Sequence, residues 1–154
     1  MTKIKICGNT RPEDVELAVE LGVDLLGFIF TRSKRQVGVE DARRLIAGLP
    51  DEVQRVGVFV DEPPEHIAEV AQACGLTAIQ VYRPLTEPDR ALGLLLLPAF
   101  RVRSGEDLSA MEFENGDHPL FDTWAPDTVG GTGRAWAGRA HGSSRASASG
   151  SPSP

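Results

Sequence analysis

A cysteine stands near the start of the chain, where a short apolar strand should end and a helix should begin. In the stretch "KIKICGNTRPED", Cys7 has the strand parity of Lys5 and is followed by Gly8. Alternate side chains of a strand share one face, so the thiol and the Lys5 ammonium are expected on the same side. A nearby cation favours the thiolate, which can act as a base. A small buried side chain is the alternative interpretation, and the residues alone leave both open.

A carboxyl group is the second candidate for chemistry. Asp122 ends a strand-like segment in "HPLFDTWAPDTVGGTG", with the parity of Leu120. Packing does not require an acid at this position, although capping of the following turn is an alternative role. If both groups face one cavity, Cys7 and Asp122 supply a proton acceptor and a proton donor to the same site.

Three further features could bind an anionic ligand. The segment "TRSKR" at 31–35 follows the second strand-like run and carries three cations, although a solvated loop is the alternative. "GGTG" at 130–133 could offer backbone N–H groups to a phosphate, but such loops are often only turns. Gln80 should point to the same side as these groups, where it could bind a ligand or contact Lys5.

Strand-like and helix-like runs alternate along the chain. The expected strands are 3–6, 24–30, 55–60, 77–82, 99–103 and 119–123. The first helix is expected to start at Thr10, in a capping box with Glu13, and to end at Gly22. The further expected helices are 39–49, 65–74 and 87–95. This alternation, with strands about 20 to 30 residues apart, is typical of parallel βα units.

The parity of the strands favours a barrel over an open doubly wound sheet. One face of the strands is apolar, as needed under helices, and the other mixes small, polar and charged residues. The apolar sets are Ile4 and Ile6; Val56, Val58 and Val60; Ile79 and Val81; Phe100 and Val102. A doubly wound sheet should be apolar on both faces. The predicted fold class is therefore α/β, a (β/α)₈ TIM barrel of which about six βα units are present, leaving the barrel incomplete.

Composition excludes several classes of protein. The 154 residues carry a net charge of −6, which argues against sequence-independent binding of nucleic acid. Two distant cysteines predict no disulfide framework and a reducing compartment. No apolar run is long enough for a membrane span, and the three histidines have no metal-ligand spacing. We expect a soluble cytoplasmic protein that binds neither nucleic acid nor membrane.

The last residues differ from the rest of the chain. After Trp136 the sequence "AGRAHGSSRASASGSPSP" has no aliphatic side chain larger than alanine. It cannot bury an apolar face, so 137–154 is expected to be a disordered low-complexity tail, and 1–136 the folded domain. Because the change is abrupt and its residues are those of GC-rich codons, a reading-frame shift near residue 136 is one hypothesis for its origin.

Several motifs taken together resemble those of phosphoribosylanthranilate isomerase, an enzyme family of tryptophan biosynthesis. They are "KICGNTRPEDVELAVELGVDLLGFIFTRSKRQV", "VGVFVDEP", "AIQVY" and "FDTWAPDTVGGTG", and they occur in order over residues 3–133. The resemblance implies an Amadori rearrangement in a (β/α)₈ barrel without metal or cofactor. It implies Cys7 as general base, Asp122 as general acid and a small anionic phosphosugar as the substrate. The substrate-binding residues that it implies are Arg35, Gln80, Gly130 and Gly131.

The chain departs from the family pattern in two places. The family usually has Gln-Leu-His-Gly where this chain has Gln80, Val81, Tyr82 and Arg83. The family also continues beyond the "GGTG" loop with two further βα units, whose loops hold the substrate phosphate. Two alternatives therefore stay open: a catalytically inactive truncated fragment, and an interaction module that uses the open sheet edge. The oligomeric state is not predicted.

Overall fold

The computed structural model describes residues 2–103, 111 and 113–123. Strands and helices alternate, as the sequence predicts. The strands are β1 Lys5–Cys7, β2 Leu25–Ile29, β3 Gln54–Phe59, β4 Ala78–Val81, β5 Leu95–Val102 and β6 Leu120–Thr123. The helices are α1 Pro12–Glu20, α2 Val39–Ile46, α3 Pro64–Cys74 and α4 Glu87–Ala91.

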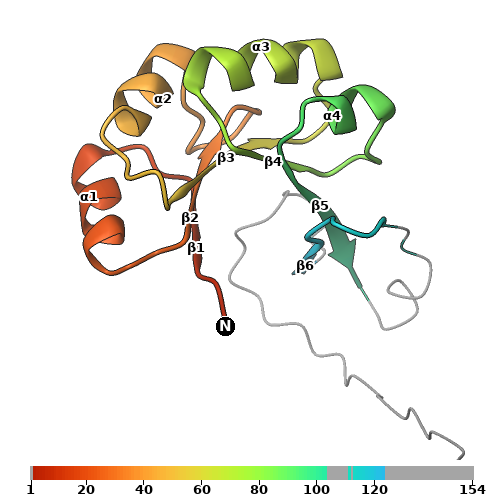
Figure 1. Cartoon of the computed structure of the whole chain (residues 1–154), viewed down its shortest axis with the longest axis horizontal. Helices are drawn as coiled ribbons and strands as arrows, with labels where there is room; N and C mark the ends of the chain where they lie inside the picture. The colour runs from red at the N-terminus through yellow and green to blue at the C-terminus, as the bar shows by residue number, and fades with distance from the viewer. Residues whose placement is uncertain (1, 104–110, 112, 124–154) are drawn as a thin grey trace, which may run out of the picture.

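All six strands run parallel and follow one another across a single sheet in the order β1-β2-β3-β4-β5-β6. The sheet is curved, and the four helices lie along its convex side (Figure 1). This is the arrangement of βα units in a barrel wall, and it confirms the predicted fold class. Within the part of the chain that the structure describes, β1 and β6 are the two edges of the sheet.

Apolar side chains pack on both faces of the sheet. On the helix side, the fully buried side chains include Leu26, Phe28, Phe59, Ile67 and Ile79. A smaller cluster lies on the concave face, which we call the lumenal face, and consists of Leu25, Val56, Ala78 and Leu97. Burial of each Val, Leu, Ile or Phe side chain of these clusters contributes about 1.5–3 kcal/mol. The two clusters fix the face to which every strand residue points.

The predicted faces are right for β4 and β5 and wrong for β3. Ile79 packs on the helix side and Ala78 on the lumenal face, as expected. In β3, however, Val56 belongs to the lumenal cluster, and Phe59 stacks on Phe30 on the helix side with ring centroids 5.4 Å apart. Both faces of this strand are apolar, so the hydrophobic pattern could not distinguish them.

The predicted capping box at the start of α1 is also wrong. The helix begins one residue later than expected, with Arg11 as N-cap and no side-chain capping bond. The capping box of this protein lies at α4, where the hydroxyl of Thr86 accepts from the backbone of Asp89 and the Asp89 carboxylate accepts from the backbone of Thr86. α4 is short, because Gly93 adopts a φ of 67° and β5 begins at Leu95. Leu95, Leu96 and Leu97 therefore belong to a strand, where a helix to residue 95 was expected.

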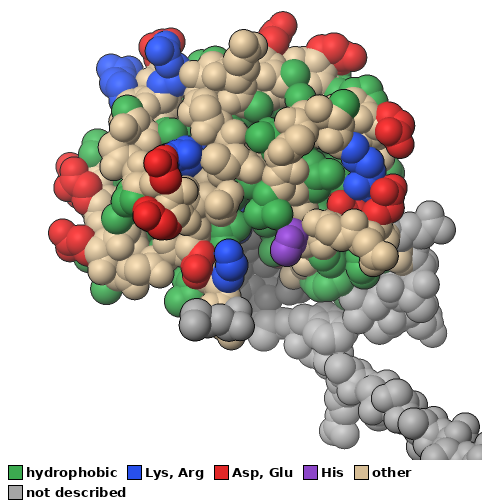
Figure 2. All heavy atoms as spheres, viewed as in Figure 1, with side chains coloured by type: hydrophobic (Ala, Val, Ile, Leu, Met, Phe, Trp, Pro, Cys, Tyr) green, Lys and Arg blue, Asp and Glu red, His purple; other side chains and the backbone are tan. Residues whose placement is uncertain are grey.

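The β1 edge carries an apolar strip that no described helix covers. The exposed fractions of Ile4 and Ile6 are 52% and 44%, although both were expected to lie under a helix. Leu17 and Leu21 of the α1 region are also exposed. On the molecular face seen in Figure 2, acidic and basic side chains are interspersed and form no continuous basic patch.

None of the helices in the described part of the chain is long and apolar enough to cross a membrane. The glycines Gly130 and Gly131 and the tail expected at 137–154 lie outside the described residues. The domain boundary expected at residue 136 lies there as well.

Candidate active site

The end of β1 is fixed to β2 by hydrogen bonds that converge on one carbonyl group. The oxygen of Gly27 accepts from the backbone N–H of Gly8 at 2.9 Å, from that of Asn9 at 3.1 Å and from Asn9 Nδ2 at 3.0 Å. Asn9 Nδ2 also donates to the oxygen of Ile6. Asn9 was not among the predicted site residues. The feature that could have indicated it is an amide side chain directly after a glycine at the end of a strand. These bonds hold the backbone beside Cys7 in place.

The thiol of Cys7 and the ammonium of Lys5 share the lumenal face, as their parity predicts. Both groups lie over Gly27. A Cβ atom at position 27 would be 3.0 Å from Cys7 Sγ and 3.1 Å from Lys5 Nζ. A side chain at position 27 would press against both groups, and glycine leaves them more room. Cys7 is half-buried and free of any disulfide.

The guanidinium of Arg35 lies against the same strand end. Its Nη1 donates a hydrogen bond of 2.6 Å to the carbonyl oxygen of Cys7. Gly8 has a φ of 81°, and a Cβ atom there would collide with this guanidinium. The side chain of Arg35 is otherwise exposed. The structure thus brings one cation of the "TRSKR" segment to the carboxyl end of β1.

A hydrogen-bonded chain of three side chains joins β4 to β6. Gln80 Nε2 donates to the hydroxyl of Tyr82 at 3.2 Å, and that hydroxyl donates to Asp122 Oδ2 at 3.1 Å. Gln80 is buried, and no polar group of the described residues bonds to its Oε1. A buried acceptor of this kind is rare in folded proteins, and it could accept a hydrogen bond from a ligand.

The pKa of Tyr82 is affected both by its hydrogen-bond partner Asp122 and by Cys7 of β1. Burial, followed by the negative charge of Asp122 and the hydrogen bond to it, raises the pKa of Tyr82 well above its usual value. The charge of Cys7 raises the same pKa further. Cys7 and Asp122, from the two edges of the sheet, therefore both act on the same phenol. The guanidinium carbon of Arg101 lies 5.8 Å from the centroid of its ring.

A buried ion pair fixes the turn that follows Tyr82. Arg83 donates to both oxygens of Asp89, at 2.6 and 2.9 Å, and to the carbonyl oxygen of Glu62 at 3.1 Å. Asp89 has no exposed surface and also accepts from the N–H and hydroxyl of Thr86. The arginine at position 83 thus ties β4 to the start of α4. Sequence reasoning noted this arginine but not its partner.

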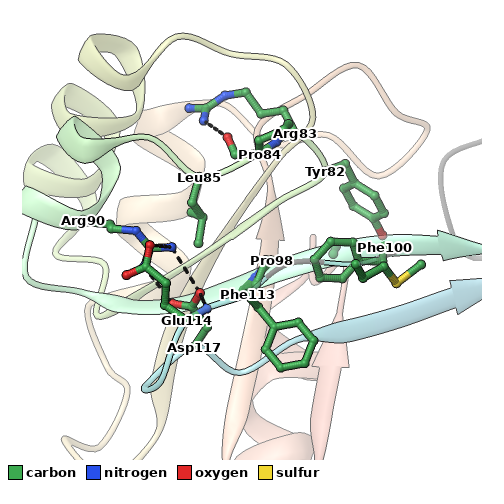
Figure 3. A pocket seen from close by; sticks show the side chains of 12 residues that line it. Tyr82, Arg83, Pro84, Leu85, Arg90, Pro98, Phe100, Phe113, Glu114 and Asp117 are labelled. Carbon is green, nitrogen blue, oxygen red and sulfur yellow. Dashed lines mark hydrogen bonds and ion pairs between the residues drawn. The ribbon is translucent and has the colours of Figure 1, made fainter. Parts of the chain in front are cut away.

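A hollow of about 550 Å³ lies beside β5 (Figure 3). The helix-facing residues Pro98 and Phe100 border it, together with α4 and the segment around Phe113. At its polar end, Arg90 pairs with Asp117 at 3.0 Å and with Glu114 at 3.1 Å. None of the candidate residues Cys7, Arg35, Gln80 and Asp122 is among its lining residues. Tyr82, which bonds to Asp122, does line the hollow, so the hollow adjoins the candidate site without containing these four residues.

The carboxyl ends of parallel strands in a barrel wall are where active sites of this fold form. Here those ends carry a thiol beside an ammonium and a carboxyl group held by a phenol. Such a set can add and remove protons from one small molecule. The fold and the site together define an acid–base enzyme built on βα-barrel units.

The comparisons with known proteins identify the family. The family model described as N-(5'phosphoribosyl)anthranilate (PRA) isomerase matches residues 4–137. The chain belongs to this family of aldose–ketose isomerases of tryptophan biosynthesis. The N-(5'-phosphoribosyl)anthranilate isomerase of Thermoanaerobacter sp. (strain X514) is 39% identical over 138 residues, which cover 88% of this chain and 68% of that protein.

Solved structures agree with this assignment. The crystal structure of phosphoribosyl anthranilate isomerase from Thermotoga maritima matches with a TM-score of 0.75 and 39% identity, covering 89% of this chain and 68% of that one. A second structure, of the isomerase in complex with reduced 1-(o-carboxyphenylamino)-1-deoxyribulose 5-phosphate, matches with a TM-score of 0.70 and 39% identity. It covers 80% of this chain and 66% of that one. The chain thus spans about two thirds of the length of these relatives.

Proposed function

We propose that this chain carries the acid and the base that isomerise N-(5'-phosphoribosyl)anthranilate to 1-(o-carboxyphenylamino)-1-deoxyribulose 5-phosphate. One observation carries the proposal beyond family membership. Asp122 on β6 bonds to the hydroxyl of Tyr82, and the charge of Cys7 on β1 raises the pKa of the same phenol, which supports a shared space on the lumenal face. An acid and a base on opposite sides of one substrate are what an aldose–ketose rearrangement requires.

Asp122 is the proton donor of the first step. Its carboxylic acid transfers a proton to the ring oxygen of the ribose as the bond from that oxygen to C1' breaks. The lone pair of the anthranilate nitrogen forms the new double bond to C1', which gives an open-chain iminium ion. Asp122 is left as a carboxylate, whose Oδ2 accepts from Tyr82.

Cys7 is the base of the second step. The iminium ion acidifies the hydrogen on C2', and the thiolate removes it, forming an enolamine and a neutral thiol. The enolamine then takes a proton at C1' while its C2' hydroxyl gives up a proton, which produces the C2' ketone with no net gain or loss of protons. The ammonium of Lys5 lies beside the thiol on the same face of the sheet.

The remaining candidates bind the substrate. The ligand in the related complex carries a carboxylate and a phosphate, and both groups call for cations or N–H donors. We assign Arg35, at the end of β1, to one of these anionic groups. The free Oε1 of Gln80 accepts from a hydroxyl or N–H of the sugar part. Backbone N–H groups of Gly130 and Gly131, which lie outside the described residues, complete the proposed set.

Turnover of N-(5'-phosphoribosyl)anthranilate by the purified chain tests the proposal, with the fluorescence of the anthranilate ring as the signal. The wild-type chain should catalyse the reaction, and Asp122→Asn should lower kcat at least about a hundredfold. Asp14→Asn, on the exposed face of α1, removes the same charge away from the site and should leave kcat unchanged. No turnover by the folded wild-type chain, or equal rates for both variants, would contradict the proposal.

A further inference from the structure

Tyr82 directly follows β4, and its hydroxyl reaches past β5 to a residue of β6, so that it has two partners. It accepts from Gln80 Nε2 and donates to Asp122 Oδ2. The opposite orientation of the Gln80 amide would draw the phenol proton to Oε1 and leave the carboxylate without this donor. With the observed orientation of the Gln80 amide, the phenol donates to the carboxylate of Asp122, and Oε1 of Gln80 has no partner among the described residues.

The surroundings keep the phenol protonated. Burial, the charge of Asp122 and the charge of Cys7 all disfavour a tyrosinate at this position. Arg101, the nearby cation from β5, stacks over the ring rather than bonding to the hydroxyl. Tyr82 therefore stays a hydrogen-bond donor over the pH range in which the protein works, and Oδ2 of Asp122 stays occupied.

The ring of Tyr82 also contacts Arg101, a cation that could otherwise form an ion pair with Asp122. Arg101 is the direct partner of Asp122 in the register of β5 and β6. Cross-strand neighbours are close enough to form an ion pair. In this structure the guanidinium lies over the face of the Tyr82 ring instead, an attractive cation–π arrangement. Among the described side chains, the other carboxylate oxygen of Asp122, Oδ1, therefore has no hydrogen-bond partner.

We propose that Tyr82 is the positioning residue of the general acid. Its hydroxyl holds Oδ2 of Asp122 and its ring holds Arg101, so that Oδ1 is the oxygen that carries and delivers the proton. The inference rests on the proposed function for the role of Asp122, but the contact itself can be tested without any activity. It assigns a role to a residue that stands where the family usually has histidine.

The chain contains one tyrosine, so the tyrosinate absorbance band reports on Tyr82 alone. We expect no tyrosinate near pH 10, the ordinary midpoint, while far-UV circular dichroism shows that the fold is intact. In Asp122→Asn the band should appear at a pH lower by about one unit or more, because the nearby charge is gone. Asp14→Asn should titrate like the wild type, since this carboxylate is remote on α1.

Two results of this titration would overturn the proposal. One is a wild-type tyrosine that ionises at its ordinary pH. The other is a midpoint that is the same in Asp122→Asn and in the wild type, which would show that the hydroxyl does not contact this carboxylate. Tyr82→Phe provides the blank, because it has no ionisable phenol.

Kinetics test the positioning role. Tyr82→Phe keeps the ring and the Arg101 contact but removes the donor, and it should lower kcat about tenfold with KM within about twofold of the wild type. Tyr82→His restores a donor and should recover most of that loss. A wild-type kcat in Tyr82→Phe, or a failure of Tyr82→His to recover any activity, would overturn the role. If the wild-type chain shows no turnover while the Asp122→Asn titration shift is present, the isomerase proposal fails and the Tyr82–Asp122 contact is supported.

Discussion

The guanidinium of Arg35 is bonded to the main-chain oxygen of Cys7, the residue whose side chain we propose as the base. The contact joins the loop after β2 to the end of β1, 28 residues away in the sequence. It passes over Gly8, whose left-handed backbone and missing Cβ make room for it. The position of the thiol and that of Arg35, the cation that we propose to bind the anionic substrate, are therefore set by the same short segment.

Replacement of Gly8 by alanine should damage both stability and substrate binding. The left-handed φ costs a non-glycine residue about 1–2 kcal/mol, and the new methyl group would displace the Arg35 guanidinium. Gly22→Ala is the matched control, because Gly22 has a φ of 74° and nothing within 4 Å of its added Cβ. Both variants should lose a similar free energy of unfolding in urea, but only Gly8→Ala should raise KM. An unchanged KM in Gly8→Ala would argue against the role given to Arg35.

Asp89→Asn should be among the most destabilising single substitutions in the chain. The Asp89 carboxylate is fully buried, and its loss leaves the Arg83 guanidinium without its two-point partner. Breaking a buried pair in this way costs about 3–5 kcal/mol. Asp51→Asn removes the partner of Arg55, but the Asp51 side chain is fully exposed and its loss should leave Tm almost unchanged. Equal melting temperatures for the two variants would contradict the importance of the buried pair.

The buried carboxylate of Asp89 should also make the stability of the fold depend on pH. Burial alone would raise the pKa of Asp89, but the hydrogen bonds from Arg83 and Thr86 outweigh it and hold that pKa below its ordinary value. The hydrogen bond from Arg90 likewise lowers the pKa of Asp117. Carboxylates of this kind stabilise the fold above the unfolded-state pKa, about 4, and the contribution is lost as the pH falls through the lower folded value.

The free energy of unfolding should therefore stay nearly constant from pH 7 to pH 5 and fall steeply below about pH 4. Urea titrations at a series of pH values measure it. In Asp89→Asn the acid-side slope should be shallower than in the wild type. A slope that does not change in this variant would show that other groups cause the loss.

The sequence predicted the order of the elements because βα units bury their apolar residues locally. Strand parity also placed Lys5 and Cys7 on the face on which the structure has them. Parity failed in β3, where valines alternate with Gly57 and Phe59 and both faces are apolar. The deciding feature there is three-dimensional: a Cβ atom at Gly57 would collide with Leu76, so this face packs against the helix layer.

The side-chain contacts within the site could not be predicted from the sequence. Tyr82 and Asp122 are 40 residues apart, and no spacing rule relates a hydroxyl to a carboxylate across two strands. Asp89 was not among the predicted site residues, and its burial involves Arg83, which folds back over the turn to bond to it. The candidate base and acid were found because both lie at strand ends. The groups that orient the acid appear only when the strands are assembled.

We propose the thiol of Cys7 as the base of the reaction. Cys74 is the matched control within the same chain, because it is a buried thiol on α3 that donates to the carbonyl oxygen of Val39. The most direct measurement compares kcat for N-(5'-phosphoribosyl)anthranilate in Cys7→Ser, Cys74→Ala and the wild-type chain, with circular dichroism to show that all three are folded. We expect Cys7→Ser to lower kcat at least about a hundredfold with little change in KM, and Cys74→Ala to stay within about threefold of the wild type. A Cys7→Ser chain that turns over substrate at nearly the wild-type rate would contradict the account.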